Sequence, residues 1–209
     1  MWKADFLREN SSFDPVCESI EEVFLRNNTG LFLIELPTES YCESNLLTIK
    51  NLLDNGYQGV YVSFQRPVKN INSWFNEYNL DLNKIKVLDG TNECKNKKEV
   101  SSPNVEDLFD KIYNSLQNID SDKKFVFIDS LTTMELIKSE SWSNNFSEHL
   151  INIKDDVDFE RIFFIINVSK DLSEKKLVKR VGSHADGLFF IDNSNDGYSV
   201  KAVKPSILT

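Results

Sequence analysis

The sequence predicts an α/β protein with a mostly parallel central sheet, helices on both faces of the sheet and a C-terminal antiparallel hairpin. Two observations predict this class. Short apolar runs rich in β-branched and aromatic residues recur along the chain, and amphipathic helical patterns lie between them. Most runs are continuous instead of alternating, which is typical of parallel strands covered by helices on both faces. A chain of 209 residues is long enough for one such domain.

Six apolar runs are the expected strands, and a seventh strand closes the sheet. The six runs lie at residues 31–36, 59–64, 85–88, 125–128, 162–168 and 188–191. A turn over residues 193–197 then leads into a strand over residues 198–203. The last two strands are therefore expected to form an antiparallel edge.

Two helices carry clear start signals. In one, Ser102 is the expected N-cap, Pro103 the first helical residue, and apolar residues follow from Val105 to Leu116 at helical spacing. In the other, Asp14 caps and Pro15 starts a helix near the beginning of the chain. We therefore expect an N-terminal segment and helix over residues 1–30 that packs on an α/β domain over residues 31–209. Residues 90–101 and 138–145 are expected to be mobile loops.

Composition and charge exclude several classes of protein. The net charge of −9 disfavours a binder that holds nucleic acid mainly by electrostatics. No stretch reaches the roughly 18 apolar residues of a membrane helix, and the first residues do not form a signal peptide. Cys17, Cys42 and Cys94 are odd in number and widely spaced, so reduced thiols and a cytoplasmic location are expected.

The turn after the first strand is where a phosphate-binding loop would lie in such a fold. Residues 37–45 contain neither glycine nor lysine, although a phosphate loop needs glycines for its backbone and a lysine for the phosphate oxygens. Glu39 and Glu43 lie there instead and would repel a phosphate at a helix N-terminus. We interpret this turn as a capped helix start, with Glu43 or Ser44 near the N-cap.

Asp129 directly follows the apolar run at residues 125–128. This is the pattern of a Walker B strand, in which the aspartate orders a magnesium ion or its waters. The same residue also suits a second role, capping the helix that follows. After the second strand stand Gln65 and Arg66, and neither is a carboxylate that could act as a general base.

The remaining candidate groups favour structural roles. His149 and His184 have no Cys or acidic partners at metal-ligand spacing, so we expect no metal site. A basic cluster on one helix is expected to be a solvated face, with an acidic partner surface as the alternative; it consists of Lys175, Lys176, Lys179 and Arg180.

Taken together, three segments resemble the KaiC/RecA-like ATPase superfamily. They are residues 59–67 followed by 80–89, residues 126–133, and the C-terminal residues 185–191 with 198–204. The resemblance runs from about Leu31 to Lys204, and the stretch around Ser102, Pro103 and Asp129 looks like archaeal KaiC-like proteins of unassigned role. It implies a RecA-like fold. It also places the family's lysine within residues 42–45, where this chain has none, and its catalytic acidic pair at Gln65 and Arg66.

The resemblance implies three alternative functions. The first is a non-catalytic, pseudo-ATPase interaction or regulatory protein with no cofactor and no catalytic residue. The second is an ATP-binding protein with weak or partner-dependent hydrolysis, in which Ser44, Asn45 and Asp129 would hold ATP and magnesium. The third and weakest is a nucleic-acid accessory factor, which the acidic composition disfavours.

Relatives in this superfamily assemble into rings or filaments, so the resemblance also implies self-association or a protein partner. Several aromatic residues lie outside the expected strands and are candidates for an exposed contact surface: Trp2, Phe6, Trp74, Phe75 and Trp142.

Overall fold

The computed structural model describes residues 29–91, 105–156, 161–170, 175–194 and 197–203. Four expectations lie outside these ranges: the helix at Asp14 and Pro15, the cap at Ser102 and Pro103, the packing of the first 28 residues, and all but the start of the loop at residues 90–101. Trp2, Phe6, Cys17 and Cys94 lie outside them as well.

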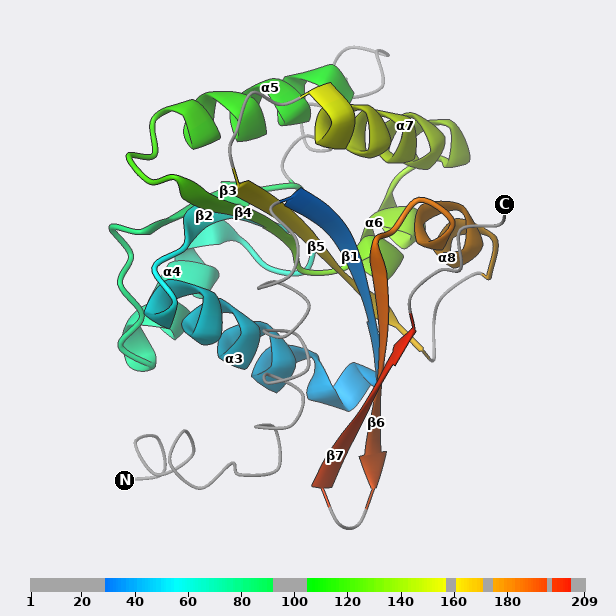
Figure 1. Cartoon of the computed structure of the whole chain (residues 1–209), viewed down its shortest axis with the longest axis horizontal. Coiled ribbons are helices and arrows are strands. Elements are labelled where there is room, and N and C mark those ends of the chain that lie inside the picture. Colours follow the sequence, from blue (N-terminus) through cyan, green and yellow to red (C-terminus); the bar gives the residue numbers. More distant parts are fainter. Residues whose placement is uncertain (1–28, 92–104, 157–160, 171–174, 195–196, 204–209) are drawn as a thin grey trace.

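Seven strands form one sheet in the order β3-β2-β4-β5-β1-β6-β7 (Figure 1). Every neighbouring pair is parallel except β6 and β7, which are antiparallel. The predicted α/β class is therefore confirmed. The strands are β1 (Thr29–Leu36), β2 (Gln58–Ser63), β3 (Ile85–Asp89), β4 (Lys123–Ile128), β5 (Arg161–Ser169), β6 (Gly187–Ser194) and β7 (Gly197–Val203).

The final hairpin differs from the predicted turn at residues 193–197. Strand β6 continues to Ser194, which pairs with Gly197, and Asn193 pairs with Tyr198. Two residues thus connect the strands, the length that best matches the twist of an antiparallel pair. The polar composition that predicted a longer turn belongs to the outer end of the hairpin.

Helices cover both faces of the sheet, as Figure 1 shows. One face packs against α3 (Tyr41–Asp54) and α4 (Val68–Glu77), with a short 3₁₀ turn, η1 (Thr38–Ser40), in front of α3. The other face packs against α5 (Val105–Gln117), α6 (Leu131–Ile137), α7 (Glu140–Asp156) and α8 (Lys175–Gly182). Alternate residues of each central strand fill the two cores, so Phe32 joins the first core and Leu33 the second. This explains the continuous apolar runs.

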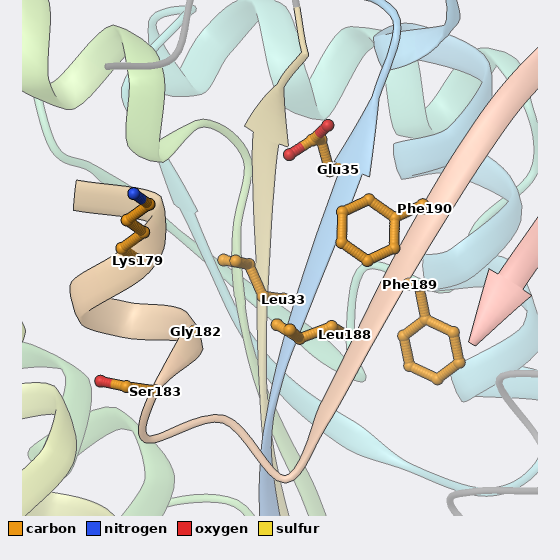
Figure 2. A pocket seen from close by; sticks show the side chains of 8 residues that line it. All are labelled: Leu33, Glu35, Lys179, Gly182, Ser183, Leu188, Phe189 and Phe190. Carbon is orange, nitrogen blue, oxygen red and sulfur yellow. The ribbon is translucent and has the colours of Figure 1, made fainter. Parts of the chain in front are cut away.

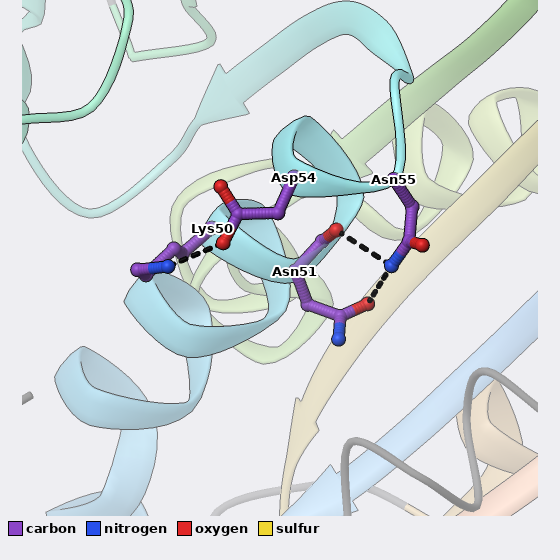
Figure 3. A network of polar contacts seen from close by, with 4 residues as sticks. All are labelled: Lys50, Asn51, Asp54 and Asn55. Atoms are coloured by element: carbon purple, nitrogen blue, oxygen red, sulfur yellow. Dashed lines mark hydrogen bonds and ion pairs between the residues drawn. The ribbon is translucent and has the colours of Figure 1, made fainter. Parts of the chain in front are cut away.

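Helix α3 ends in a tight polar turn (Figure 3). The Asn55 side-chain amide donates to the Asn51 carbonyl oxygen at 3.1 Å, and Lys50 pairs with Asp54 one turn along. Gly56 has a φ of +83°, and the amide of Tyr57 donates to the Leu52 carbonyl at 2.9 Å. A residue in the left-handed region followed by this bond is a Schellman ending, which directs the chain into β2.

Residues 138–145 do not form the predicted loop. Helix α7 begins at Glu140, and Ser139 accepts a hydrogen bond from the Trp142 amide at 3.2 Å. Trp142, Phe146 and Leu150 follow one another at four-residue spacing and are all buried in the second core. The Ser- and Asn-rich sequence hid this stripe, because burial of three large side chains outweighs weak helix propensity.

The expectation that Trp74, Phe75 and Trp142 form an exposed contact surface is wrong. Trp142 is 4% exposed and Phe75 is 0% exposed, so neither can present a surface to a partner. Trp74 is half-buried and packs against Phe75 and Tyr78. These aromatics belong to the protein's own cores.

Candidate functional site

The carboxyl ends of β1, β2, β4 and β5 meet at one edge of the sheet. In open parallel sheets, ligands bind at this edge, in the turns that follow the strands. Four residues mark it here: Leu36, Ser63, Ile128 and Ser169 end their strands. This edge therefore holds the candidate site.

The turn after β1 is short and enters α3 directly. Pro37 is extended, with φ −60° and ψ 144°, and the 3₁₀ turn η1 leads into α3 at Tyr41. The Thr38 and Ser169 hydroxyl groups share a hydrogen bond of 2.6 Å, which ties the turn to the end of β5. The predicted cap at Glu43 or Ser44 is wrong. The N-cap is Ser40, which makes no side-chain capping bond, because the preceding 3₁₀ turn already continues into the helix.

Asp129 follows β4 and is 1% exposed. Its Oδ2 accepts a hydrogen bond from the Ser63 hydroxyl at 2.6 Å, and its Oδ1 accepts one from the Phe64 amide at 2.8 Å. The hydroxyl of Tyr61 lies 3.5 Å from Oδ2. The carboxylate therefore joins β4 to the end of β2, and its two oxygens are already engaged by protein donors.

Helix α6 is capped by the next residue instead. The Ser130 hydroxyl accepts a hydrogen bond from the Thr133 amide at 2.9 Å. The expectation that Asp129 caps the following helix is therefore wrong. A serine with an extended backbone directly before the helix is the better-placed acceptor, while Asp129 points back toward β2.

A chain of buried polar side chains extends this contact across the sheet edge. The Asn45 amide of α3 donates to the Tyr61 hydroxyl at 3.1 Å, and the Asn167 amide of β5 donates to the Asn45 side-chain oxygen. All three side chains are buried. Asn167, Asn45, Tyr61 and Asp129 thus connect β5, α3, β2 and β4 in one network.

Burial shifts the protonation of the groups at this edge. It raises the pKa of Asp129 to about 6, although the hydrogen bonds from Ser63 and Phe64 favour the charged form and oppose the rise. Burial also raises the pKa of Tyr61 and of Tyr41 above that of an ordinary phenol. Both tyrosines therefore stay neutral at any physiological pH.

The three predicted ligand residues are not equivalent. Asn45 and Asp129 belong to the same network through Tyr61. Ser44 is 0% exposed and its hydroxyl has no hydrogen-bond partner, so it lies beside the network without joining it. Gln65 and Arg66 are exposed, and the Arg66 guanidinium lies 3.3 Å from the Cys42 sulfur.

Other residues from the sequence analysis lie away from this edge. His149 stacks on Phe109, with ring centroids 5.3 Å apart, and His184 is exposed after α8. Among the described residues, no three His, Cys, Asp or Glu side chains come together as a metal site would require. Of the helices in the described ranges, none has the length and hydropathy to cross a bilayer.

The sequence analysis missed Tyr61, Ser63 and Asn167. Each ends or interrupts an apolar run that was interpreted as core alone. Asn167 carries a usable signal, because an amide inside the run at residues 162–168 must find a buried partner. The partner, Asn45, lies on α3, the helix that follows β1, and it reaches Asn167 because β1 lies beside β5 in the sheet.

With this geometry known, the chain can be compared with solved structures. A crystal structure of a KaiC-like protein from the hyperthermophilic archaeon Pyrococcus horikoshii OT3 matches with a TM-score of 0.56. The match covers 84% of this chain and 77% of that one, at 15% identity. This chain has the fold of a KaiC-like protein.

A second structure with the same kind of match is an uncharacterized Pyrococcus horikoshii protein in complex with an unknown peptide. It has a TM-score of 0.59 and 11% identity, and the match covers 84% of this chain and 83% of that chain. No family model and no curated protein matches the sequence. At these identities the KaiC-like, RecA-like fold is what the comparisons establish.

Proposed function

We propose that this chain is a non-catalytic KaiC-like protein that acts by binding other protein surfaces. One observation carries the proposal: Asp129, at the position where an active relative would order magnesium, is buried and bonded to Ser63 and Phe64 of the neighbouring strand. A magnesium ion there would compete with both hydrogen bonds for the carboxylate oxygens and would have to be desolvated in a buried site.

The turn over residues 37–45, which follows β1 at the same end of the sheet, supports the same proposal. It has no glycine to wrap a phosphate and no lysine to neutralise one. Glu39 is exposed there, and Tyr41 is buried at the start of α3. A nucleotide phosphate would therefore meet the negative charge of Glu39 and the buried ring of Tyr41, at the place where a phosphate-binding loop would supply backbone N–H donors.

A protein partner is the class of ligand that this fold supports best once nucleotide is set aside. The second structural match holds an unknown peptide, so a protein of similar fold accommodates a polypeptide. The alternative of an ATP-binding protein with weak or partner-dependent hydrolysis keeps one supporting observation, the place of Asp129 and Asn45 at the ligand-binding edge.

Calorimetric titration and thermal denaturation with magnesium and ATP separate the two functions. At about 100 times its dissociation constant, a bound nucleotide would stabilise the fold by about 2.7 kcal/mol, which corresponds to a shift of roughly 5–10 °C for a chain of this size. We expect no heat of binding and no shift at millimolar concentrations.

The matched control is Asp129→Asn under the same conditions. If the wild type shows a shift and the variant loses it, Asp129 takes part in a nucleotide site and the alternative function is correct. A shift that is equal in both proteins would place a nucleotide elsewhere on the surface.

A further inference from the structure

An open cavity of about 350 Å³ lies between α8 and the sheet, on the face opposite to α3. Small-molecule sites in proteins commonly measure about 300–1,000 Å³, so this cavity is large enough for a small ligand. Its lining residues come from β1, from β6 and from the end of α8. None of them belongs to the hydrogen-bond network that holds Asp129.

Two cross-strand pairs form the floor of this cavity. Leu33 of β1 pairs with Leu188 of β6. Two residues further along each strand, Glu35 pairs with Phe190. Side chains two residues apart on a strand project from the same face of the sheet, so all four face α8. The floor is therefore apolar at one end and carries a carboxylate beside an aromatic ring at the other (Figure 2).

Helix α8 covers this floor and leaves room beneath it because Gly182 has no side chain. A Cβ at Gly182 would meet Leu188 at 3.5 Å and Leu33 at 3.9 Å, which is ordinary van der Waals contact, and a longer side chain would enter the cavity. Lys179 lies one turn earlier on the same side of the helix. Since a crossover helix runs antiparallel to the strands that it connects, Lys179 lies toward their carboxyl ends, as Glu35 does.

Two opposite charges thus stand at the mouth of the cavity. Figure 2 shows the Glu35 carboxylate and the Lys179 ammonium group beyond the leucines, at the same end of the cavity. Among the described residues, neither side chain takes part in a hydrogen bond or an ion pair. The hydroxyl of Ser183, which also lines the cavity, already donates to the Arg180 carbonyl at 2.8 Å. A ligand would therefore meet one anion and one cation next to an apolar floor.

This charge pattern decides among classes of ligand. A fatty acid would bring its carboxylate close to Glu35, and an alkylamine would bring its ammonium group close to Lys179, so each would meet a like charge as well as an opposite one. A zwitterion with an apolar body avoids both conflicts. Its ammonium group would face Glu35 and the Phe190 ring, its carboxylate would face Lys179, and its body would lie on the leucines. A free α-amino acid carries both charges on one carbon, whereas an internal residue of a peptide carries neither.

We propose that the cavity between α8 and the sheet binds a free α-amino acid with a large aliphatic or aromatic side chain, with Glu35 against its ammonium group and Lys179 against its carboxylate. The site adds a small-molecule ligand to the proposed protein-binding function and does not rest on it. Because it uses neither Asp129 nor the turn over residues 37–45, its failure would leave the nucleotide titrations unchanged.

Calorimetric titration of the full chain with a small set of matched compounds tests the ligand class. L-Leucine and L-phenylalanine are the expected ligands. Each of the other compounds lacks one feature: 3-methylbutylamine has no carboxylate, 4-methylpentanoate has no ammonium group, and free glycine has no apolar body. We expect saturable binding of L-leucine or L-phenylalanine at millimolar concentrations or below, and affinities at least about tenfold lower for the other three.

Two variants that remove one charge each test the assigned contacts. Glu35→Gln should weaken binding of L-leucine at least about tenfold and bind 4-methylpentanoate at least as well as the wild type does, because the repelling carboxylate is gone. Lys179→Gln should weaken L-leucine in the same way and retain 3-methylbutylamine. A general loss of structure would weaken all three compounds alike. Lys86→Gln, on the exposed side of β3 at the far edge of the sheet, is the matched control and should bind L-leucine as the wild type does.

Two substitutions of Gly182 test the cavity itself. Gly182→Leu should abolish binding of every compound, because its side chain fills the space above the leucines. Gly182→Ala should bind L-leucine with less than about a tenfold loss, since a Cβ fits there at ordinary contact distance. The proposal is wrong if the wild type shows no saturable binding of either amino acid. Undiminished binding of L-leucine by Gly182→Leu, or by both Glu35→Gln and Lys179→Gln, would also overturn it.

Discussion

The side-chain amide of Asn45 donates a hydrogen bond to the hydroxyl of Tyr61 at 3.1 Å, deep in the core. Asn45 lies in α3 and Tyr61 in β2, so this bond joins the first helix after β1 to a strand three places away from β1 in the sheet. This hydrogen bond gives the Asn45 amide and the Tyr61 hydroxyl a partner in place of water, without which burying them would be costly. The edge of the sheet is thereby closed by hydrogen bonds within the protein.

Asn45→Ala should destabilise the fold by about 2–4 kcal/mol. The substitution leaves the Asn167 amide and the Tyr61 hydroxyl in the core, each without this partner, and an unsatisfied buried group costs about 1–3 kcal/mol. Urea denaturation measures the loss. Asn114→Ala on the exposed side of α5 is the control and should change stability by less than about 0.5 kcal/mol. Equal effects would mean that the network contributes nothing.

The raised pKa of Asp129 predicts a specific dependence of stability on pH. The folded protein binds this proton up to about pH 6, whereas the unfolded chain releases it near 3.8. Between these values the folded state holds more of this proton, so the contribution of Asp129 to the free energy of unfolding falls as the pH rises and then stays level above about pH 6.

Comparison with Asp129→Asn isolates this contribution, because other carboxylates titrate in both proteins. From pH 4 to pH 7 the wild type should lose about 2–3 kcal/mol relative to the variant. Denaturant titrations at several pH values give the difference. A difference that does not change with pH would show that Asp129 ionises in the folded protein as it does in the unfolded chain.

Gly56, between α3 and β2, and Gly59, in β2, should lose different amounts of stability when each is replaced by alanine. Gly56 needs its positive φ but has open space around it, so Gly56→Ala should cost about 1 kcal/mol. At Gly59 a Cβ would lie 2.1 Å from the Phe125 carbonyl oxygen of the neighbouring strand β4. Gly59→Ala should therefore cost at least about 3 kcal/mol, since β2 and β4 must separate. Thermal denaturation of the two variants makes the comparison, and a milder loss at Gly59 would contradict it.

The two tryptophans of the described chain should also differ. Trp142 is 4% exposed and stacks on Phe146, with ring centroids 5.3 Å apart, so Trp142→Ala should cost about 3–5 kcal/mol. Trp74 is half-buried beside Arg66, and Trp74→Ala should cost clearly less. Chemical denaturation of both variants tests this order. The reverse order would support the original expectation that Trp142 lies on a contact surface.

Helix α7 shows where prediction from the sequence failed. The segment at residues 138–145 is polar apart from Trp142, and its local preferences favour a loop. The helix forms because Trp142 and Phe146 pack against Phe64 from the end of β2. That contact joins residues far apart in the chain, so no window of local sequence contains it.

The sequence by itself determined the strands, the mostly parallel sheet, the absence of a glycine- and lysine-bearing phosphate loop, and the position of Asp129 after β4. Each of these follows from residue types and spacing within a short stretch, where burial periodicity and side-chain chemistry act locally. The tertiary structure alone decided that Asp129 binds Ser63 and Phe64, that Asn167 reaches Asn45, and that Leu136 remains in solvent. The two hydrogen-bonded contacts depend on the order of strands in the sheet, because a buried polar group takes the partner that packing brings beside it. The exposure of Leu136 depends on which face of α6 packs against the sheet.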